Sequence, residues 1–228
     1  MMLKRPLPAS VLFDLDGTLI DTAPDFVSVI NQLCAQFDIN PPSPKAIHAT
    51  VSSGARALTQ LAFGLSPQDD GFEIRLQALL DLYGQQINAS HARLYPRMQA
   101  LLLRLSDHAI PWGVVTNKPL RYSEPLLSVL GLSENCAVLI CPDHVSHSKP
   151  HPEPLLLACK RLGCEPEASI YVGDHPRDIE AGRAAGMATI AAAYGYLPPE
   201  SPIDDWQADF IAASTDDISR YIWQEDTK

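Results

Sequence analysis

Residues 11–19 read Val11-Leu12-Phe13-Asp14-Leu15-Asp16-Gly17-Thr18-Leu19, a short apolar run that leads into two aspartates one residue apart. Such a run, bounded by polar residues, is typical of a buried strand in a parallel sheet. Two carboxylates at its end repel each other, and burial increases the cost, unless one of them simply caps a helix. Mg²⁺ prefers carboxylate oxygens together with waters and a phosphate. Asp14 and Asp16 are therefore candidate metal-site residues, and Gly17 permits the backbone to bend beside them.

Apolar runs of the same kind recur along the chain, separated by stretches with helical periodicity. Strand–helix alternation predicts an α/β fold with a doubly wound parallel sheet. Ligands bind beyond the carboxyl ends of such strands, so the polar residues that end the runs should meet in space. The expected strands are 11–13, 112–115, 138–140, 170–172 and 188–193, and the expected helices are 98–105, 123–130, 153–162 and 178–185.

The stretch between the first two strands, residues 20–94, is far longer than the dozen or so residues that a crossover connection needs. Its pattern is helical, and we interpret it as a small α-helical cap domain that acts as a lid over the carboxyl edge of the sheet. The catalytic core would then consist of residues 1–19 and 95–228. The helices expected in the cap are 26–37, 44–51, 55–63 and 72–86.

The composition excludes several classes of function. With 17 Lys+Arg against 27 Asp+Glu, the net charge of −10 argues against nucleic-acid or anionic-membrane binding. No apolar run approaches the roughly 18 residues of a membrane helix, and no secretory signal is evident, so we expect a cytoplasmic monomer or weak homodimer. No GxGxxG or GxxxxGK motif follows a strand, which excludes dinucleotide-binding and P-loop chemistry.

Cysteines and histidines give weaker signals. The five cysteines contain no CxxC pair, which predicts free thiols. A zinc site on His144, His147 and His151 stays an alternative to a plain histidine-rich loop.

Further motifs come at the ends of the later strands. Thr116-Asn117-Lys118 offers a hydroxyl and backbone N–H groups to a phosphate, or forms a simple turn. Lys149 precedes a proline, so it stays extended and can project into a cleft. Gly173-Asp174 ends a strand at the same edge as Asp14, and Asp178 begins the next helix, where it could equally be the N-cap.

In chain order, these motifs resemble those of the haloacid-dehalogenase superfamily. The matching residues are Asp14-x-Asp16-Gly17-Thr18, Thr116, Lys149 and Gly173-Asp174-x-x-x-Asp178. The ordered set is specific although each motif alone is not, and the likeness covers residues 8–20 and 95–225. The helical insertion is similar to the family's C1-type cap. The resemblance implies Mg²⁺ as cofactor and a small phosphorylated substrate.

The resemblance also implies a role for each matched residue. Asp14 would be the nucleophile that forms an aspartyl-phosphate, and Asp16 would be the general acid and then the general base. Asp14, the backbone carbonyl of Asp16, and Asp174 would bind Mg²⁺, with Asp178 supporting the metal indirectly. Lys149 would offset negative charge. The phosphoryl oxygens would be held by Thr116, Asn117 and Lys149.

Several stretches resemble particular groups of the superfamily. Those similar to phosphoglycolate phosphatases are 21–24, 114–119 and 149–155. Those similar to N-acetylmuramic acid 6-phosphate phosphatases are 51–57, 112–115 and 140–145. Within the cap, Ser53, Gly54 and Arg56 are candidate specificity residues, because small residues leave room for a sugar and Arg56 could bind a substrate carboxylate. The alternative is that Arg56 is solvated, as most arginines are.

Asp16 favours phosphomonoester hydrolysis or phosphomutase chemistry, because the resemblance implies that dehalogenases and P-type ATPases lack this second aspartate. A phosphomutase of the β-phosphoglucomutase type stays open, and it would return the phosphoryl group to a second hydroxyl. A catalytically silent binding protein would keep a costly set of carboxylates without using it. A phosphonatase would need a reactive cap lysine, and Lys45 lies in a proline-rich setting with no sign of a lowered pKa.

Overall fold

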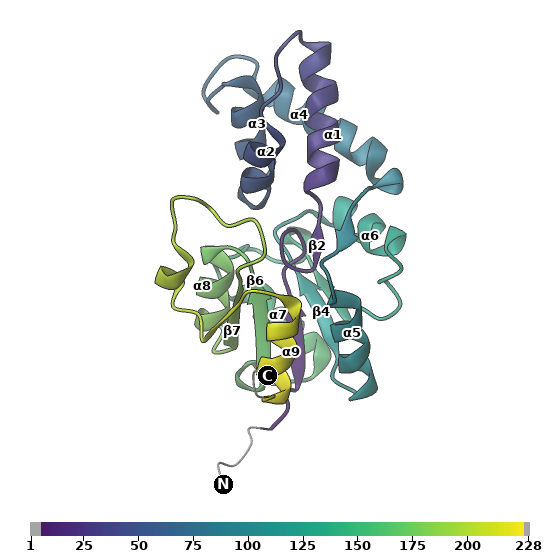
Figure 1. Ribbon diagram of the computed structural model, residues 1–228, viewed down its shortest axis with the longest axis vertical. Helices are drawn as coiled ribbons and strands as arrows, with labels where there is room; N and C mark the ends of the chain where they lie inside the picture. Colours follow the sequence, from purple (N-terminus) through teal and green to yellow (C-terminus); the bar gives the residue numbers. More distant parts are fainter. Residues whose placement is uncertain (1–5, 226–228) are drawn as a thin grey trace.

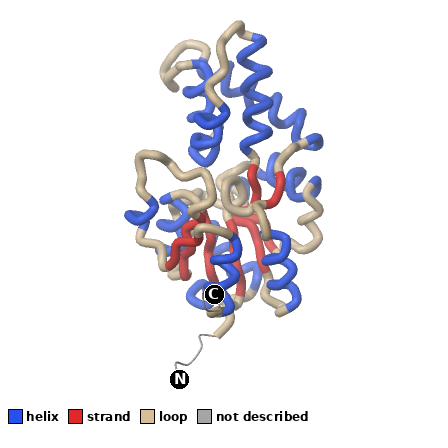
Figure 2. The backbone as a smooth tube through the Cα atoms, viewed as in Figure 1, coloured by secondary structure: helices blue, strands red, loops and turns tan. Residues whose placement is uncertain are grey.

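The computed structural model describes residues 6–225, so residues 1–5 and 226–228 of the expected core lie outside the described residues. Six parallel strands form the main sheet in the order β5-β4-β1-β6-β7-β8, with helices on both faces (Figures 1 and 2). The predicted doubly wound α/β fold is confirmed. The elements of the sheet layers are β1 Ser10–Phe13, α5 Met98–Asp107, β4 Trp112–Val115, α6 Leu120–Val129, β5 Val138–Ile140, α7 Glu153–Leu162, β6 Ser169–Gly173, α8 Pro176–Ala184, β7 Ala188–Ala192, β8 Phe210–Ala212 and α9 Thr215–Trp223.

Strand β1 lies between β4 and β6, and all of its residues are buried. Phe13 stands in register with Val114 of β4 and with Val172 of β6. Because these parallel strands end at nearly the same level, the residues that follow them emerge together at one edge of the sheet. This register brings Asp14, Thr116 and Asp174 to that edge.

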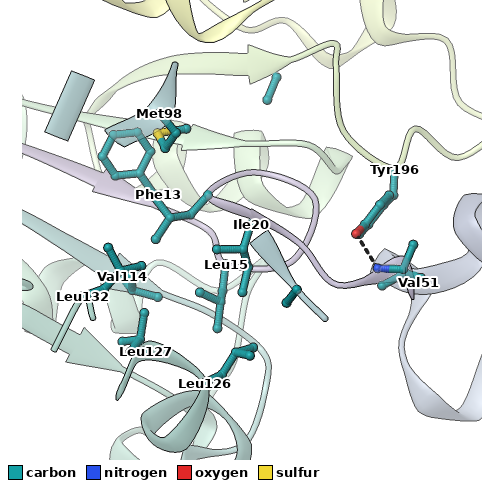
Figure 3. Close-up of a cluster of buried hydrophobic side chains, with 14 of the residues drawn as sticks. Phe13, Leu15, Ile20, Val51, Met98, Val114, Leu126, Leu127, Leu132 and Tyr196 are labelled. Atoms are coloured by element: carbon teal, nitrogen blue, oxygen red, sulfur yellow. Dashed lines mark hydrogen bonds between the residues drawn. The ribbon is translucent and has the colours of Figure 1, made fainter. Parts of the chain in front are cut away.

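Alternate residues of β1 serve the two faces of the sheet, as the period of two in a strand requires. Val11 and Phe13 belong to a hydrophobic cluster that includes Leu101 of α5 and Ile218 of α9. Figure 3 shows Phe13 of this cluster beside Met98, the first residue of α5. Leu12 belongs to the cluster on the other face, which side chains of α7 and α8 complete. An apolar run with no alternation is thus explained by helices that cover both faces.

A strand occurs at each of the five expected positions, but β8 was not predicted. Its three residues form the sheet edge beside β7, and only Ala212 of them is buried. A three-residue, half-exposed edge strand carries too little periodicity to be recognised from sequence. The expected free thiols are confirmed, since all five cysteines are unpaired.

Four helices and two short 3₁₀ turns, Val51–Ser53 and Ile87–Ala89, form a bundle beyond the carboxyl edge of the sheet (Figure 1). The ring of Phe26 stacks on that of Tyr83 at 4.6 Å, and the two residues join α1 to α4. The chain enters and leaves this bundle through a two-stranded antiparallel ribbon, β2 and β3, which was also not predicted. The elements are β2 Ile20–Asp21, α1 Ala23–Gln36, α2 Pro44–Thr50, α3 Ala55–Phe63, α4 Phe72–Gln86 and β3 Arg93–Leu94. Within residues 6–225, no helix is long and apolar enough to cross a membrane.

The turn after β1 depends on Gly17, which has a φ of +84°. A Cβ atom at this position would collide with the carboxylate of Asp174 and with the ring of Tyr196. Both the backbone conformation and the space therefore require glycine.

We predict that Gly17→Ala lowers the free energy of unfolding by about 2–4 kcal/mol, because backbone strain adds to overpacking. Gly131→Ala is the matched control, since Gly131 has a φ of +67° but open space around it. That change should cost only about 1 kcal/mol. Urea unfolding of the two variants measures the difference, and equal losses would contradict the steric explanation.

Candidate active site

Three buried carboxylates meet at the carboxyl edge of the sheet. Asp14 follows β1, Asp174 follows β6, and Asp178 lies in the first turn of α8. One oxygen from each lies within 4.8 Å of the others, and the exposed fractions of the three residues are 4%, 0% and 0%. The topology thus brings together residues that are 160 positions apart in sequence.

Lys149 is the cation that this cluster encloses. Its Nζ atom lies 2.9 Å from Asp14 Oδ1 and 2.7 Å from Asp178 Oδ1, and its side chain is fully buried. The same ammonium donates to the Tyr171 hydroxyl at 2.7 Å and to the Val115 carbonyl at 3.0 Å. All of its partners are oxygen atoms of the sheet edge, so the position of the ammonium is fixed.

The environment changes the acidities of these groups in different directions. Burial alone would raise the pKa of Asp14, but the neighbouring Lys149 holds it below its usual range. Burial and the charges of Asp14 and Asp178 raise the pKa of Asp174 to about 7. The pKa of Asp178 is also raised, mainly by burial, against the opposing effect of Lys149. One lysine therefore does not compensate three carboxylates.

This cluster fits a divalent cation. Carboxylate oxygens are the protein ligands that Mg²⁺ prefers, and the raised pKa of Asp174 indicates charge repulsion that a cation would relieve. The carboxylate of Asp16 is not part of this cluster, so a contact between Asp16 and a metal through its backbone carbonyl stays a prediction. Asp178 is the third member of the cluster, so its carboxylate lies near enough to a metal position to act as more than an indirect support.

Asp16 instead faces a second lysine. Lys118 Nζ lies 3.0 Å and 3.3 Å from its two carboxylate oxygens, and Thr22 donates to Oδ1 at 2.5 Å. Burial would lower the pKa of Lys118, but Asp16 and Tyr83 raise it above its usual value. Lys118 also lies over the rings of Tyr83 and Phe26, at 4.6 Å and 5.3 Å from their centroids. These contacts orient the Asp16 carboxylate.

Thr116 and Asn117 lie beside these carboxylates, at the end of β4. The Asn117 side chain donates to the Lys149 carbonyl at 2.9 Å and accepts from the Lys149 N–H at 3.1 Å. Its amide is therefore occupied in positioning Lys149, and its backbone N–H is the group left for a phosphate. The hydroxyl of buried Thr116 accepts from the Lys118 backbone N–H at 3.1 Å.

A cavity of about 280 Å³ opens between the sheet edge and the helical bundle. Asp14 and Asp16 lie in it together with Thr116 and Asn117, so most of the expected site residues share one pocket. The bundle contributes small residues and the aromatic side chains of Phe26 and Tyr83, and α6 adds Tyr122 to this aromatic wall. The remaining lining residues are Phe26, Val51, Ser52, Ser53, Gly54, Ala55, Leu80, Tyr83, Lys118, Pro119, Tyr122 and Arg177.

Of the expected cap residues, Ser53 and Gly54 line the cavity, but Arg56 does not. The Arg56 guanidinium forms an ion pair of 2.9 Å with Glu73 and lies 4.8 Å from the Phe72 ring centroid. Its side chain is 53% exposed. The structure therefore places Arg56 on the outer surface of the bundle, where contacts between α3 and α4 hold it.

Two contacts link the bundle to the carboxylate cluster. Ser52 Oγ donates to Asp174 Oδ2 at 2.9 Å, and the backbone N–H of Tyr196 donates to the same oxygen at 2.8 Å. The Tyr196 hydroxyl accepts from the N–H groups of Thr22 and Ala23 at 2.6 Å and 2.9 Å, and Figure 3 shows this side chain extending toward the start of the bundle. The Asp174 carboxylate is thus hydrogen-bonded directly to Ser52 of the bundle. Through Tyr196 it is also linked to residues 22 and 23, where the chain enters the bundle.

Sequence reasoning gave no role to Lys118, Arg177 or Tyr196. Lys118 and Arg177 lie inside recognised motifs, and their place in those motifs was the only feature of the sequence that could have pointed to them. Tyr196 lies far from any motif. The three histidines considered as an alternative zinc site do not share one set of contacts: His147 and His151 lie 3.0 Å and 3.9 Å from Glu153 Oε2, whereas His144 Nδ1 accepts the Cys141 N–H.

Comparison with known proteins is consistent with this geometry. The model of the family described as haloacid dehalogenase-like hydrolase matches residues 11–192. A Pseudomonas putida protein named N-acetylmuramic acid 6-phosphate phosphatase is 46% identical, covering 89% of this chain and 90% of its own. A phosphoglycolate phosphatase of Xanthomonas campestris is 39% identical, with coverages of 90% and 91%. The crystal structure of a predicted phosphoglycolate phosphatase from Haemophilus somnus superimposes with a TM-score of 0.82 and 28% identity, over 93% of this chain and 97% of that one.

We predict that Mg²⁺ stabilises the wild-type protein by relieving the repulsion among the carboxylates, by about 2.7 kcal/mol at a hundred times its Kd. Asp174→Asn should remove most of this effect, while Asp107→Asn, a change on the exposed surface, should leave it intact. Thermal unfolding with and without Mg²⁺ measures both. An unchanged Mg²⁺ response in the Asp174 variant would contradict a metal site at this cluster.

Proposed function

Because the chain belongs to the haloacid dehalogenase-like hydrolase family and is a phosphoric monoester hydrolase, we propose that it removes the phosphate of N-acetylmuramic acid 6-phosphate. The observation that supports this substrate is the pocket, in which Asp14 and Asp16 face small cap residues and an aromatic wall. The relatives that carry this name are 46% identical to the chain. 2-Phosphoglycolate is the second candidate, supported by relatives at 39% identity.

The pocket lining favours the larger of these two substrates. Phe26, Tyr83 and Tyr122 line the pocket together with the small residues at 52–55. These three aromatic side chains are already almost buried, so the size preference rests on the cavity of about 280 Å³, which a sugar phosphate fills more fully than a two-carbon acid.

In the proposed first step, the Asp14 carboxylate attacks phosphorus in line, and an aspartyl-phosphate forms as the bond from phosphorus to the sugar oxygen breaks. Asp16, oriented by Thr22 and Lys118, enters this step in its protonated form and gives that proton to the sugar oxygen, and Lys118 then pairs with the carboxylate that remains. In the second step, Asp16 takes a proton from a water molecule, whose oxygen attacks phosphorus. Inorganic phosphate leaves, and Asp14 is regenerated.

The other residues of the site would stabilise charge. Lys149 lies against Asp14 and offsets the negative charge of the phosphoryl group, which Thr116 and the backbone N–H groups near it would bind. Asp14, Asp174 and the Asp16 carbonyl would hold Mg²⁺, with Asp178 beside them. The ion would supply further charge neutralisation.

We also propose that residues 20–94 act as a lid on the core formed by 1–19 and 95–228. The paired strands β2 and β3 are the two connections at which such a lid would turn. Closure would exclude bulk water from the reaction.

The proposed chemistry predicts that Asp14→Asn lowers kcat for p-nitrophenyl phosphate by about 10³-fold or more, because the nucleophile is lost.

Asp16→Asn should lower turnover of a sugar phosphate by about 10²–10⁴-fold, because the leaving oxygen of the sugar needs the proton that Asp16 supplies. Asp107→Asn is the control, and EDTA should abolish wild-type turnover. Phosphate release measures each, and full activity of the Asp14 variant would rule out the aspartyl-phosphate.

The substrate is tested by phosphate release from N-acetylmuramic acid 6-phosphate, 2-phosphoglycolate and hexose phosphates at equal concentration. We expect the highest kcat/KM for the first compound. Conversion of glucose 1-phosphate without phosphate release would instead identify a phosphomutase.

A further inference from the structure

Arg177 is a cation of the pocket that the proposed chemistry does not use. It lies in the first turn of α8, between Asp174 and Asp178 in sequence, and lines the cavity with Asp14 and Asp16. Lys118 is the other cation in the described lining, and its ammonium is already paired with Asp16. Arg177 is therefore the cation available to an anionic ligand.

The hydrogen bonds of Arg177 are incomplete. One Nη2–H donates to the carbonyl of Ser52, which places the guanidinium beneath the cap. The Nε–H is buried and has no partner among the described residues. A buried donor without an acceptor is costly, and the guanidinium edge offers paired donors that match a carboxylate.

The backbone positions of Arg177 and Thr116 lie on opposite sides of β1, although the Lys149 ammonium reaches across β1 to Asp178. Thr116 and Lys149 follow β4 and β5, on one side of β1, whereas Arg177 follows β6, on the other side. The phosphoryl group already has donors on the first side. An anion bound by Arg177 would therefore be a second anionic group of the same substrate.

We propose that Arg177 binds the carboxylate of the substrate and thereby selects acidic phosphate esters over neutral ones. This inference rests on the proposed function, since both candidate substrates carry a carboxylate beside the phosphate. It transfers to Arg177 the role expected of Arg56, whose guanidinium is held outside the cavity by Glu73.

The test uses two substrates that differ only in the acid. N-acetylmuramic acid 6-phosphate carries a lactyl ether on the 3-oxygen, and N-acetylglucosamine 6-phosphate carries a hydroxyl there. The ratio of their kcat/KM values cancels any effect on the shared chemistry or on cap docking. Arg177→Gln should lower this ratio by about 10–100-fold, mainly through KM for the acidic substrate.

Two variants make the result specific. Arg177→Lys keeps the charge but loses the paired donors, so the ratio should fall by less than in Arg177→Gln. Arg183→Gln, on the same helix, with an exposed contact to Gln207, should leave the ratio unchanged. Thermal unfolding shows which variants are folded. If either Arg177→Gln or Arg177→Lys fails to fold, the kcat/KM ratio of the other one tests the proposal.

Each outcome has one meaning. Equal losses on both substrates would assign Arg177 to the phosphoryl group or to cap docking and overturn the proposal, as would an unchanged ratio. A fall in the ratio with Arg56→Gln instead would move the carboxylate site to the start of α3. Wild-type protein that releases phosphate from neither acidic substrate would overturn the proposed function itself, which is a different result from turnover with an unchanged ratio.

Discussion

The ammonium of Lys149 lies between the carboxylates of Asp14 and Asp178, and Asp174 completes the cluster without a lysine of its own. Burying three like charges beside one cation costs free energy, which is visible in the raised pKa of Asp174. The fold supports this arrangement with rigid neighbours. At Gly195, a Cβ would collide with Asp174 and with the Gly17 carbonyl, so the loop after β7 closes directly over the cluster.

The same cluster connects the sheet to the helical bundle. Asp174 accepts hydrogen bonds from Ser52 of the cap and from Tyr196, whose hydroxyl bonds the chain at Thr22 and Ala23, where it enters α1. A change in the charge or position of Asp174 therefore acts on both the cap and its connection. Binding of a cation at the cluster would therefore be linked to the position of the helical bundle through one carboxylate, since both depend on where the Asp174 oxygens point.

The sequence was informative where a short-range pattern reflects a long-range constraint. Continuous apolar runs such as Val11–Phe13 arise because both faces of a parallel strand are covered, and the aspartates that follow them must share one edge. Those patterns predicted the fold class and the meeting of Asp14 with Asp174. The ribbon of β2 and β3 has two residues in each strand, too few for any period to be recognised.

Side-chain direction was the part that sequence could not supply. Arg56 begins a helix beside small residues, which is a reasonable setting for a ligand-binding arginine. Its orientation depends on Glu73, which comes from the next helix and which no local pattern associates with it. Tyr196 raises the same difficulty, because its partners are about 175 residues away in the chain. Long side chains with many rotamers take their direction from tertiary neighbours.

The residues around the pocket differ in how strongly the carboxylate cluster depends on them, and this difference limits which of them can vary with the substrate. Lys149 and Thr116 are buried among strand ends, so a change at either would disturb the charge balance of the cluster. Arg177 is only partly buried and projects from α8 toward a backbone carbonyl of the helical bundle, so its hydrogen bond to that carbonyl lies outside the carboxylate cluster, while its positive charge helps to lower the pKa of Asp14. Of the cap residues that line the same pocket, Gly54 has a φ of +88° that favours glycine, whereas Ser53 has no such restriction, so Ser53 and Arg177 are the positions at which the pocket can be reshaped around Asp14.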